Sequence, residues 1–130
     1  PRVDFIHWVM VDLPPTLREV TEGQFSAGFT TRGKAGPATL LGARHGLNDY
    51  TGWFAGNADM SGNYFGYDGP FPPFNDSILH HYVFTVYALD LANLQVEGNF
   101  TGADVRAAMT GHVLDEACLT GIYTLNKRLA

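Results

Sequence analysis

The sequence predicts an all-β or β-rich α+β fold, and its length and composition support this prediction. The chain has 130 residues, the length of one domain, so we expect a single domain over residues 1–130. Its 15 glycines and 7 prolines indicate a backbone that turns often, as in proteins built from short strands. Charged residues make up only 16% of the chain, against a usual value of about 25%, whereas apolar residues make up 45%. This composition excludes a disordered chain, a coiled coil and a long solvated helix.

The first element that we expect is a buried strand over Phe5–Asp12. This segment is apolar on both alternating faces, as in a central strand that is covered on both sides, and two prolines follow it. Residues 16–73 are rich in glycine, asparagine and aromatic residues and show no sustained helical period. We expect at most short strands there, near Gln24–Phe29 and Leu40–Gly46. Irregular segments of this length are often functional.

The second half of the chain carries the strongest secondary-structure signals. His80–Asp90 is rich in β-branched and aromatic residues, which predicts a long strand. Thr101 followed by Asp104 is the pattern of a capping box and predicts a short helix that ends near Gly111. Residues 113–125 fit a helical face as well as a strand, and their β-favouring residues lead us to expect a strand over Cys118–Leu125.

The charge pattern restricts the partners. The formal net charge is −5 and the basic residues are scattered, which argues against a nucleic-acid partner because phosphate binding requires clustered cations. No apolar run approaches the roughly 18 residues of a membrane span, and no signal-peptide pattern opens the sequence. We therefore expect a soluble, cytoplasmic protein that does not span a membrane. The single cysteine, Cys118, cannot form an internal disulfide, and its apolar neighbours predict a buried thiol.

Histidines and a tyrosine on the predicted strands are the candidate binding residues. Strand periodicity places His80 and Tyr82 on one face of their strand and His81 on the other. His7 lies on the first strand and is expected to point into a layer of side chains. A histidine in such a position is more often a core group with one hydrogen bond than a ligand-binding group. If His7 and His80 converge, however, two imidazoles and a phenol make a donor-rich site that suits an oxyanion.

No motif of a catalytic or metal site is present. His80 and His81 face opposite sides of their strand and cannot bind one zinc ion together. The phosphate loop, the nucleophile elbow and the zinc-protease helix motif are absent. We therefore expect no cofactor, no metal ion and no catalysis. Two alternatives remain: a hydrolase or lyase that uses His7 and His80 with Asp49 as orienter, and a pure protein-interaction module that uses the aromatic loop Tyr64–Tyr67.

Taken in order along the chain, several of these segments resemble the phosphatidylethanolamine-binding protein family, in its bacterial Raf-kinase-inhibitor-like branch. The matching stretches are Phe5–Val9 with Asp12–Pro14, Gly46–Tyr50, Tyr67–Pro73, His80–Asp90 and Ala108–Leu114 through Gly121–Tyr123. They follow the order of the family and cover the chain from end to end. Each stretch alone is a weak signal, whereas the combination is specific.

The resemblance implies a mostly β fold: two antiparallel sheets with a Greek-key core, and a few short peripheral helices. It also implies one small pocket for phosphate, a carboxylate or a phospholipid headgroup. Family members act as binding modules and as inhibitors of protein kinases or proteases rather than as catalysts. Carried onto this chain, the pocket residues are His7, His80 and Tyr82, with Phe71 and Pro72 on a proline-rich rim.

The resemblance further predicts strands that this sequence does not contain. Family members have an Asp-x-Asp-x-Pro segment just before the His-Trp strand and several strands upstream of it, whereas this chain begins at Pro1. Without a neighbouring strand, Phe5–Val11 would carry unpaired backbone groups and an open edge. We therefore expect a complementing N-terminal segment or a second copy, in a homodimer, to cover this edge.

Overall fold

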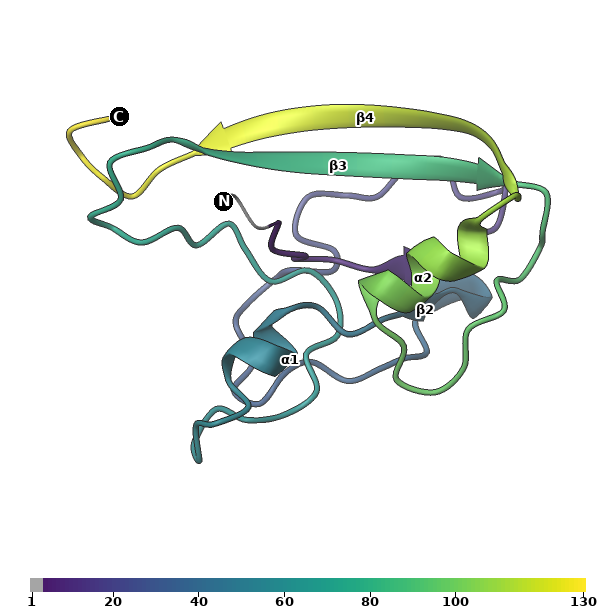
Figure 1. Ribbon diagram of the computed structural model, residues 1–130, viewed down its shortest axis with the longest axis horizontal. Coiled ribbons are helices and arrows are strands. Elements are labelled where there is room, and N and C mark those ends of the chain that lie inside the picture. Colours follow the sequence, from purple (N-terminus) through teal and green to yellow (C-terminus); the bar gives the residue numbers. More distant parts are fainter. Residues whose placement is uncertain (1–3) are drawn as a thin grey trace. The chain divides into compact units, whose positions relative to one another are not determined.

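A computed structural model describes residues 4–130, which form two compact units. The first unit contains residues 4–68 and 91–110, and the second contains residues 69–90 and 111–130. The regular structure is mostly β, with two antiparallel sheets and a few short helices (Figure 1), which confirms the predicted fold class. The single-domain assignment over residues 1–130 stays a prediction.

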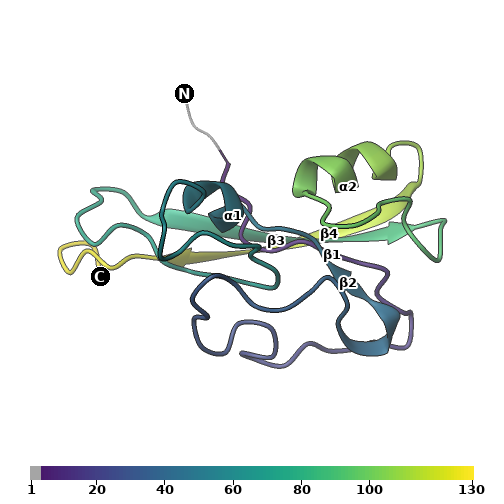
Figure 2. The ribbon, with the colours of Figure 1, turned by 90° about the horizontal axis from the view of Figure 1, so that it is seen from below.

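The first unit is built around a small antiparallel sheet. Its strands β1 and β2 pair with Met10 opposite His45, and Figure 2 shows them side by side. Short helices and long irregular segments complete this unit. Its elements are β1 (Met10–Val11), the 3-10 helix η1 (Leu40–Gly42), β2 (Arg44–His45), α1 (Tyr50–Trp53) and α2 (Gly102–Met109).

The predicted strand Phe5–Asp12 is therefore much shorter than expected. Only its last part forms a ladder, while the backbone before it bonds to irregular segments: Ile6 O accepts from Asp49 N–H (2.8 Å), and Val9 O accepts from Gly46 N–H (2.9 Å). The strand stops at Asp12, whose φ of 61° lies in the left-handed region. The segment is extended and partly buried as predicted, but its hydrogen bonds go to loops rather than to a continuous strand.

Two further sequence predictions are corrected here. Residues 24–29 form turns instead of a strand, since Ala27 N–H donates to Gly23 O (2.8 Å). The segment Leu40–Gly46 does contain β2, but its first part forms η1 because Leu41 adopts a φ of 55°, which a strand excludes.

The core of the first unit consists of large side chains from distant parts of the chain. Tyr64 is fully buried, and Phe65 and Phe100 are nearly so. Gly46 passes directly over this core, where an added Cβ would lie 2.7 Å from the Phe100 ring and 2.8 Å from Val9 Cγ1. Only glycine fits at this position without displacing the core.

Arg44 ties the segment 91–100 to the small sheet. Its guanidinium donates to the Asp12 carboxylate (2.8 Å), to Val96 O (2.6 Å) and to Leu94 O (3.0 Å), and lies 5.4 Å from the centre of the Phe100 ring. The guanidinium fork can reach these acceptors together because its N–H groups diverge in one plane. These contacts hold the segment 91–100 beside β1 and β2.

Helix α2 begins as the sequence predicts. The Thr101 hydroxyl accepts from Asp104 N–H (3.3 Å), and the Asp104 carboxylate accepts from Thr101 N–H (2.9 Å), which together complete the capping box. The helix ends at Met109, close to the predicted end near Gly111. The local sequence alone specifies this element.

Removing the cap should destabilise the chain. We expect Thr101→Ala to lower the free energy of unfolding by about 1 kcal/mol, because Asp104 N–H loses its acceptor. Urea unfolding followed by circular dichroism measures this change. Thr101→Ser keeps the hydroxyl and should stay close to the parent; equal losses in both variants would show that the cap bond is not the cause.

The second unit is a long β-hairpin preceded by a proline-rich segment. Strand β3 (His80–Leu89) pairs antiparallel with β4 (Val113–Tyr123), from His80 opposite Tyr123 to Leu89 opposite Val113 (Figure 1). The predicted strand His80–Asp90 is confirmed. The second strand begins at Val113 instead of Cys118, and the helical alternative is wrong, because pairing along the whole of β3 outweighs the local helical period.

Both faces of the hairpin carry exposed apolar side chains. Val86 (62% exposed) and Leu119 (73%) lie on one face, and Val83 and Ile122 lie on the other. Cys118 is also exposed, so the prediction of a buried thiol is wrong. The thiol lies opposite Thr85 in a two-stranded ladder that buries neither face. A two-stranded hairpin is marginally stable without a further strand or covering layer.

The exposed hairpin should associate. We expect the purified 130-residue chain to form species larger than a monomer, since long apolar strands with open edges pair with other strands. Leu119→Lys should reduce this association, measured by multi-angle light scattering. Gln95→Lys makes the same charge change at an exposed position of the first unit and should have no effect. A monodisperse monomer of the parent chain would contradict the prediction.

Candidate functional site

His7 is held at one ring nitrogen by the backbone of Asp68. Its Nδ1 lies 2.6 Å from Asp68 O, and Asp68 N–H donates back to His7 O (3.2 Å). A carbonyl oxygen can only accept, so we assign the Nδ1 proton to His7 in this bond. Nε2 is then an acceptor in the neutral ring and becomes a donor only when the ring is protonated.

Aromatic side chains of the first unit surround the His7 ring. The centre of the Phe5 ring lies 4.7 Å away, and the rings of Tyr50 and Tyr67 lie at 5.7 Å and 6.4 Å. Burial raises the pKa of both tyrosines, and the negative charge of Asp68 raises the pKa of Tyr50 further. Both phenols therefore remain neutral hydrogen-bonding groups through the physiological range.

The Asp68 carboxylate, only 5% exposed by residue, anchors this region. Its Oδ1 accepts from Lys34 Nζ (2.5 Å) and its Oδ2 accepts from Asn48 Nδ2 (2.7 Å). Asn48 Nδ2 also donates to Gly66 O (3.1 Å). A buried carboxylate needs such partners, and they fix the carbonyl on which His7 rests.

His80 has a matching arrangement in the second unit. Its Nε2 lies 2.6 Å from Asp76 Oδ2, and this bond is the main reason that the pKa of Asp76 lies below its usual value. Asp76 is held in turn by Asn126, whose amide donates to Asp76 O (2.9 Å). The ionised carboxylate can only accept, so the proton lies on His80 Nε2 and Nδ1 is the atom that a ligand can approach.

The other candidate residues of the second unit lie on or before β3. The Tyr82 ring stacks near His80, with ring centres 6.5 Å apart, which confirms that the two share a strand face. In the preceding loop, Phe71 is 74% exposed and Pro72 is buried. His7 belongs to the first unit and the other four residues to the second, so the convergence of His7 with His80 stays a prediction.

Of the two alternative functions, the hydrolase or lyase stays a prediction, whereas the interaction module loses part of its proposed surface. The Asp49 carboxylate accepts from Ile6 N–H (2.8 Å) and so anchors the backbone beside His7. The interaction loop is corrected: Tyr64 and Phe65 are 0% and 3% exposed and belong to the core, so they cannot offer an aromatic surface to a partner.

Two further features, a metal site and a membrane-spanning helix, are absent from residues 4–130. No three side chains of His, Cys, Asp or Glu gather closely enough there to hold a metal ion. None of the helices in the same range is long and apolar enough to cross a lipid bilayer.

Comparison with known proteins decides the family. The model of the family described as phosphatidylethanolamine-binding protein matches residues 1–124. The chain belongs to this family. Among its relatives, a UPF0098 protein of the archaeon Methanothermobacter thermautotrophicus is 36% identical over 123 residues, and the UPF0098 protein YbhB of Escherichia coli is 30% identical over 118 residues.

Solved structures of the family agree with this assignment. A phosphatidylethanolamine-binding protein homologue from Chlamydia trachomatis superposes with a TM-score of 0.62 at 29% identity, covering 92% of this chain and 57% of its own. YbcL of E. coli superposes with a TM-score of 0.59 at 28% identity, covering 91% and 60%. The chain spans 65% of the archaeal relative and 61% of YbhB, while 95% and 91% of this chain are covered.

Sequence reasoning missed the polar residues that surround His7 in this candidate site. Asn48 and Asp68 lie inside the segments that carried the resemblance, but no role was assigned to them, and Lys34 lies outside those segments. The available signal was a polar residue among apolar and aromatic neighbours, as in the run from Tyr64 to Phe71. A buried polar residue is more informative than an exposed apolar one.

His45 on β2 was also missed. It is 5% exposed, its Nε2 is buried with no hydrogen-bond partner among residues 4–130, and its ring meets that of Phe25 at 5.1 Å. Burial, and then the positive charge of Lys34, lower the pKa of His45 below its usual value. The folded chain therefore favours the neutral imidazole.

This lowered pKa predicts a loss of stability in acid. Below about pH 6.5 the unfolded chain gains a proton at His45 while the folded chain does not, so the free energy of unfolding falls until the pH reaches the lower folded pKa. His45→Gln should show a shallower fall than the parent in urea unfolding between pH 7.5 and pH 5. His81→Gln, at an exposed site, should follow the parent. Parallel curves for parent and His45→Gln would contradict this assignment.

Proposed function

We propose that the chain is a non-catalytic binding module for small anionic groups: phosphate, a phospholipid headgroup or a carboxylate. The observation that carries the proposal is a shared arrangement at two histidines of a phosphatidylethanolamine-binding protein. His7 and His80 each have one ring nitrogen tied to an internal acceptor, Asp68 O and the Asp76 carboxylate. We assign the other nitrogen of each ring to the ligand.

This arrangement selects the charge of the ligand. With one proton fixed on the internal acceptor, each ring presents an acceptor when neutral and a second N–H donor when protonated. The ionised oxygens of an oxyanion can only accept, so they require the protonated ring and form a charge-assisted bond with it. Anion binding by His7 or His80 is therefore coupled to proton uptake.

The remaining residues shape the site. The Tyr82 hydroxyl adds a donor from the same strand face as His80, and the buried Pro72 gives the rim a rigid backbone. The exposed Phe71 offers an apolar contact beside the polar groups. The family resemblance adds a regulatory role, in which the module binds a protein kinase or a protease through this rim.

Anion affinity should depend on pH. We expect O-phosphorylethanolamine to bind more tightly at pH 6 than at pH 7.5 in isothermal titration calorimetry, because binding takes up a proton at imidazole. Inorganic phosphate and acetate, titrated in parallel, separate headgroup recognition from simple oxyanion recognition. His80→Ala should weaken binding in each case.

His81→Ala is the matched control, since it removes an imidazole from the opposite face of the same strand. It should leave affinity unchanged. Binding that is absent, or that His80→Ala and His81→Ala reduce equally, would contradict the assigned site.

The chain should not turn over substrates. We expect no more than trace hydrolysis of phosphoesters, acyl esters and peptides, because no nucleophile has been assigned beside either histidine and a positioned base alone contributes only about 100- to 10,000-fold. A broad hydrolase screen measures this. Robust activity that disappears in His7→Ala would favour the hydrolase or lyase alternative instead.

A further inference from the structure

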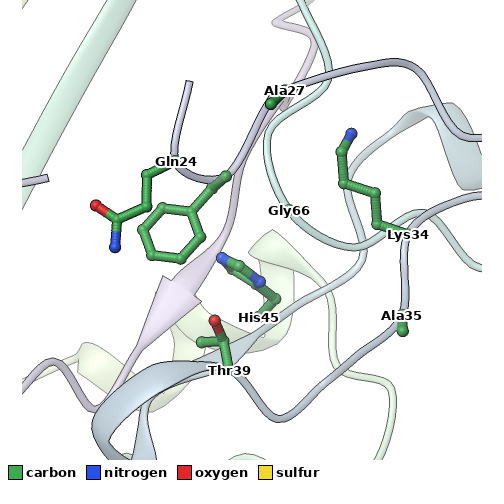
Figure 3. A pocket seen from close by; sticks show the side chains of 8 residues that line it. Gln24, Ala27, Lys34, Ala35, Thr39, His45 and Gly66 are labelled. Atoms are coloured by element: carbon green, nitrogen blue, oxygen red, sulfur yellow. The ribbon is translucent and has the colours of Figure 1, made fainter. Parts of the chain in front are cut away.

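A cavity lies in the first unit, and none of the five proposed site residues lines it. Its volume is about 190 Å³, and it is formed by loop residues together with His45 of β2 (Figure 3). At about 30 Å³ for each water molecule of the liquid, this volume matches about six waters or one small organic molecule. All of the lining residues belong to the first unit.

His45 is the buried polar residue in the lining of this cavity. Its imidazole lies at the centre of the view in Figure 3, with Gln24 on one side and Lys34 and Ala35 on the other. The backbone N–H of His45 donates to Pro37 O (2.7 Å), whereas its buried Nε2 has no partner among the described residues. Buried polar groups almost always have a hydrogen-bond partner, so we expect a partner for Nε2 that residues 4–130 do not supply.

Lys34 adds a single cation. Its ammonium donates to the Asp68 carboxylate (2.5 Å) and to Tyr67 O (3.4 Å), and its side chain is 19% exposed. An ammonium group has three N–H bonds, so one donor remains for a ligand. Because Asp68 already balances the charge, the cavity favours a weakly acidic organic molecule over a phosphate dianion.

The other lining residues favour a ligand with an aromatic ring. The Phe25 ring and the methyl groups of Ala27 and Ala35 provide apolar surface, and the Thr39 hydroxyl adds a small polar group. A flat ring can stack on Phe25 while a hydroxyl on that ring reaches the imidazole. A hydroxyl group donates and accepts, so it satisfies either tautomer of His45.

We propose that this cavity binds a small hydroxyaromatic acid. The hydroxyl group bonds to the imidazole of His45, the ring packs on Phe25, and the carboxylate accepts from Lys34. This site goes beyond the proposed anion pocket, because it uses none of the five residues assigned to bind the anion and recognises a hydroxyl group on a ring instead of an oxyanion alone.

The test compares 4-hydroxybenzoate with benzoate. Each is titrated into the ¹⁵N-labelled chain at pH 7.5, with the His45 ring nitrogens and the Gly66 amide followed by NMR. We expect 4-hydroxybenzoate to shift these signals and to bind about tenfold more tightly than benzoate, which lacks the hydroxyl bond. In His45→Phe the two compounds should bind equally.

Two controls keep the sites distinct. His7→Ala should leave 4-hydroxybenzoate binding unchanged, and O-phosphorylethanolamine should not displace it, whether or not the anion pocket itself is confirmed. Ala35→Leu keeps His45 but fills the cavity, so it should abolish binding even if His45→Phe does not fold. Overturning results are an unshifted His45 signal, a preference for 4-hydroxybenzoate that persists in His45→Phe, or displacement by O-phosphorylethanolamine.

Discussion

The buried carboxylate of Asp68 is the constraint on which the first unit depends. A charged group with so little exposure is tolerated only when its oxygens are fully partnered, and here the partners are Lys34 and Asn48. These residues come from three separate segments of the chain, so satisfying one carboxylate fixes the relative positions of all three. The backbone of Asp68 then exchanges hydrogen bonds with His7 in a fourth segment.

This constraint also has a chemical consequence. The network holds the Asp68 carbonyl still, and the carbonyl holds the His7 Nδ1 proton. Asp76 does the same for His80 with a carboxylate instead of a carbonyl. In both cases the histidine is oriented before any ligand arrives, which reduces the ordering that binding requires. This preorientation supports the proposal that the two histidines bind an anion.

Lys34 connects this network to the cavity that His45 lines. The same ammonium that balances Asp68 also lies close enough to His45 to lower its pKa. A ligand acceptor near Lys34 would therefore change the electrostatic potential at the His45 imidazole. The first unit thus contains two histidine environments of opposite character. His7 has its proton fixed by a carbonyl, whereas His45 is buried beside a cation and has no partner at Nε2 among residues 4–130.

Local signals explain which elements the sequence could predict. The capping box gave α2 nearly to the residue, and the β-branched run gave β3, because both depend on neighbours in the sequence. The start of β4 could not be found in this way, since pairing with β3 defines it. The strand expected over Phe5–Asp12 became mostly irregular because its hydrogen-bond partners lie in loops.

The site shows the same division. Strand periodicity placed His80 beside Tyr82, whereas the Asp68 network joins residues that are 20 and 34 positions apart and have no common motif. His45 was missed because a lone histidine in a glycine-rich segment carries no periodic signal. Contacts of this kind become visible only when the loops that hold them are folded.

The central claim is that Asp68 fixes the proton of His7 on Nδ1 and that an anion binds at Nε2. Long-range ¹H–¹⁵N correlation of the imidazole rings tests it directly. At pH 8 without ligand we predict the Nδ1–H tautomer for His7, and on saturation with phosphate at pH 6.5 the pattern of a ring protonated at both nitrogens. An Nε2–H tautomer in the unliganded chain, or a His7 spectrum that phosphate does not change, would contradict the account.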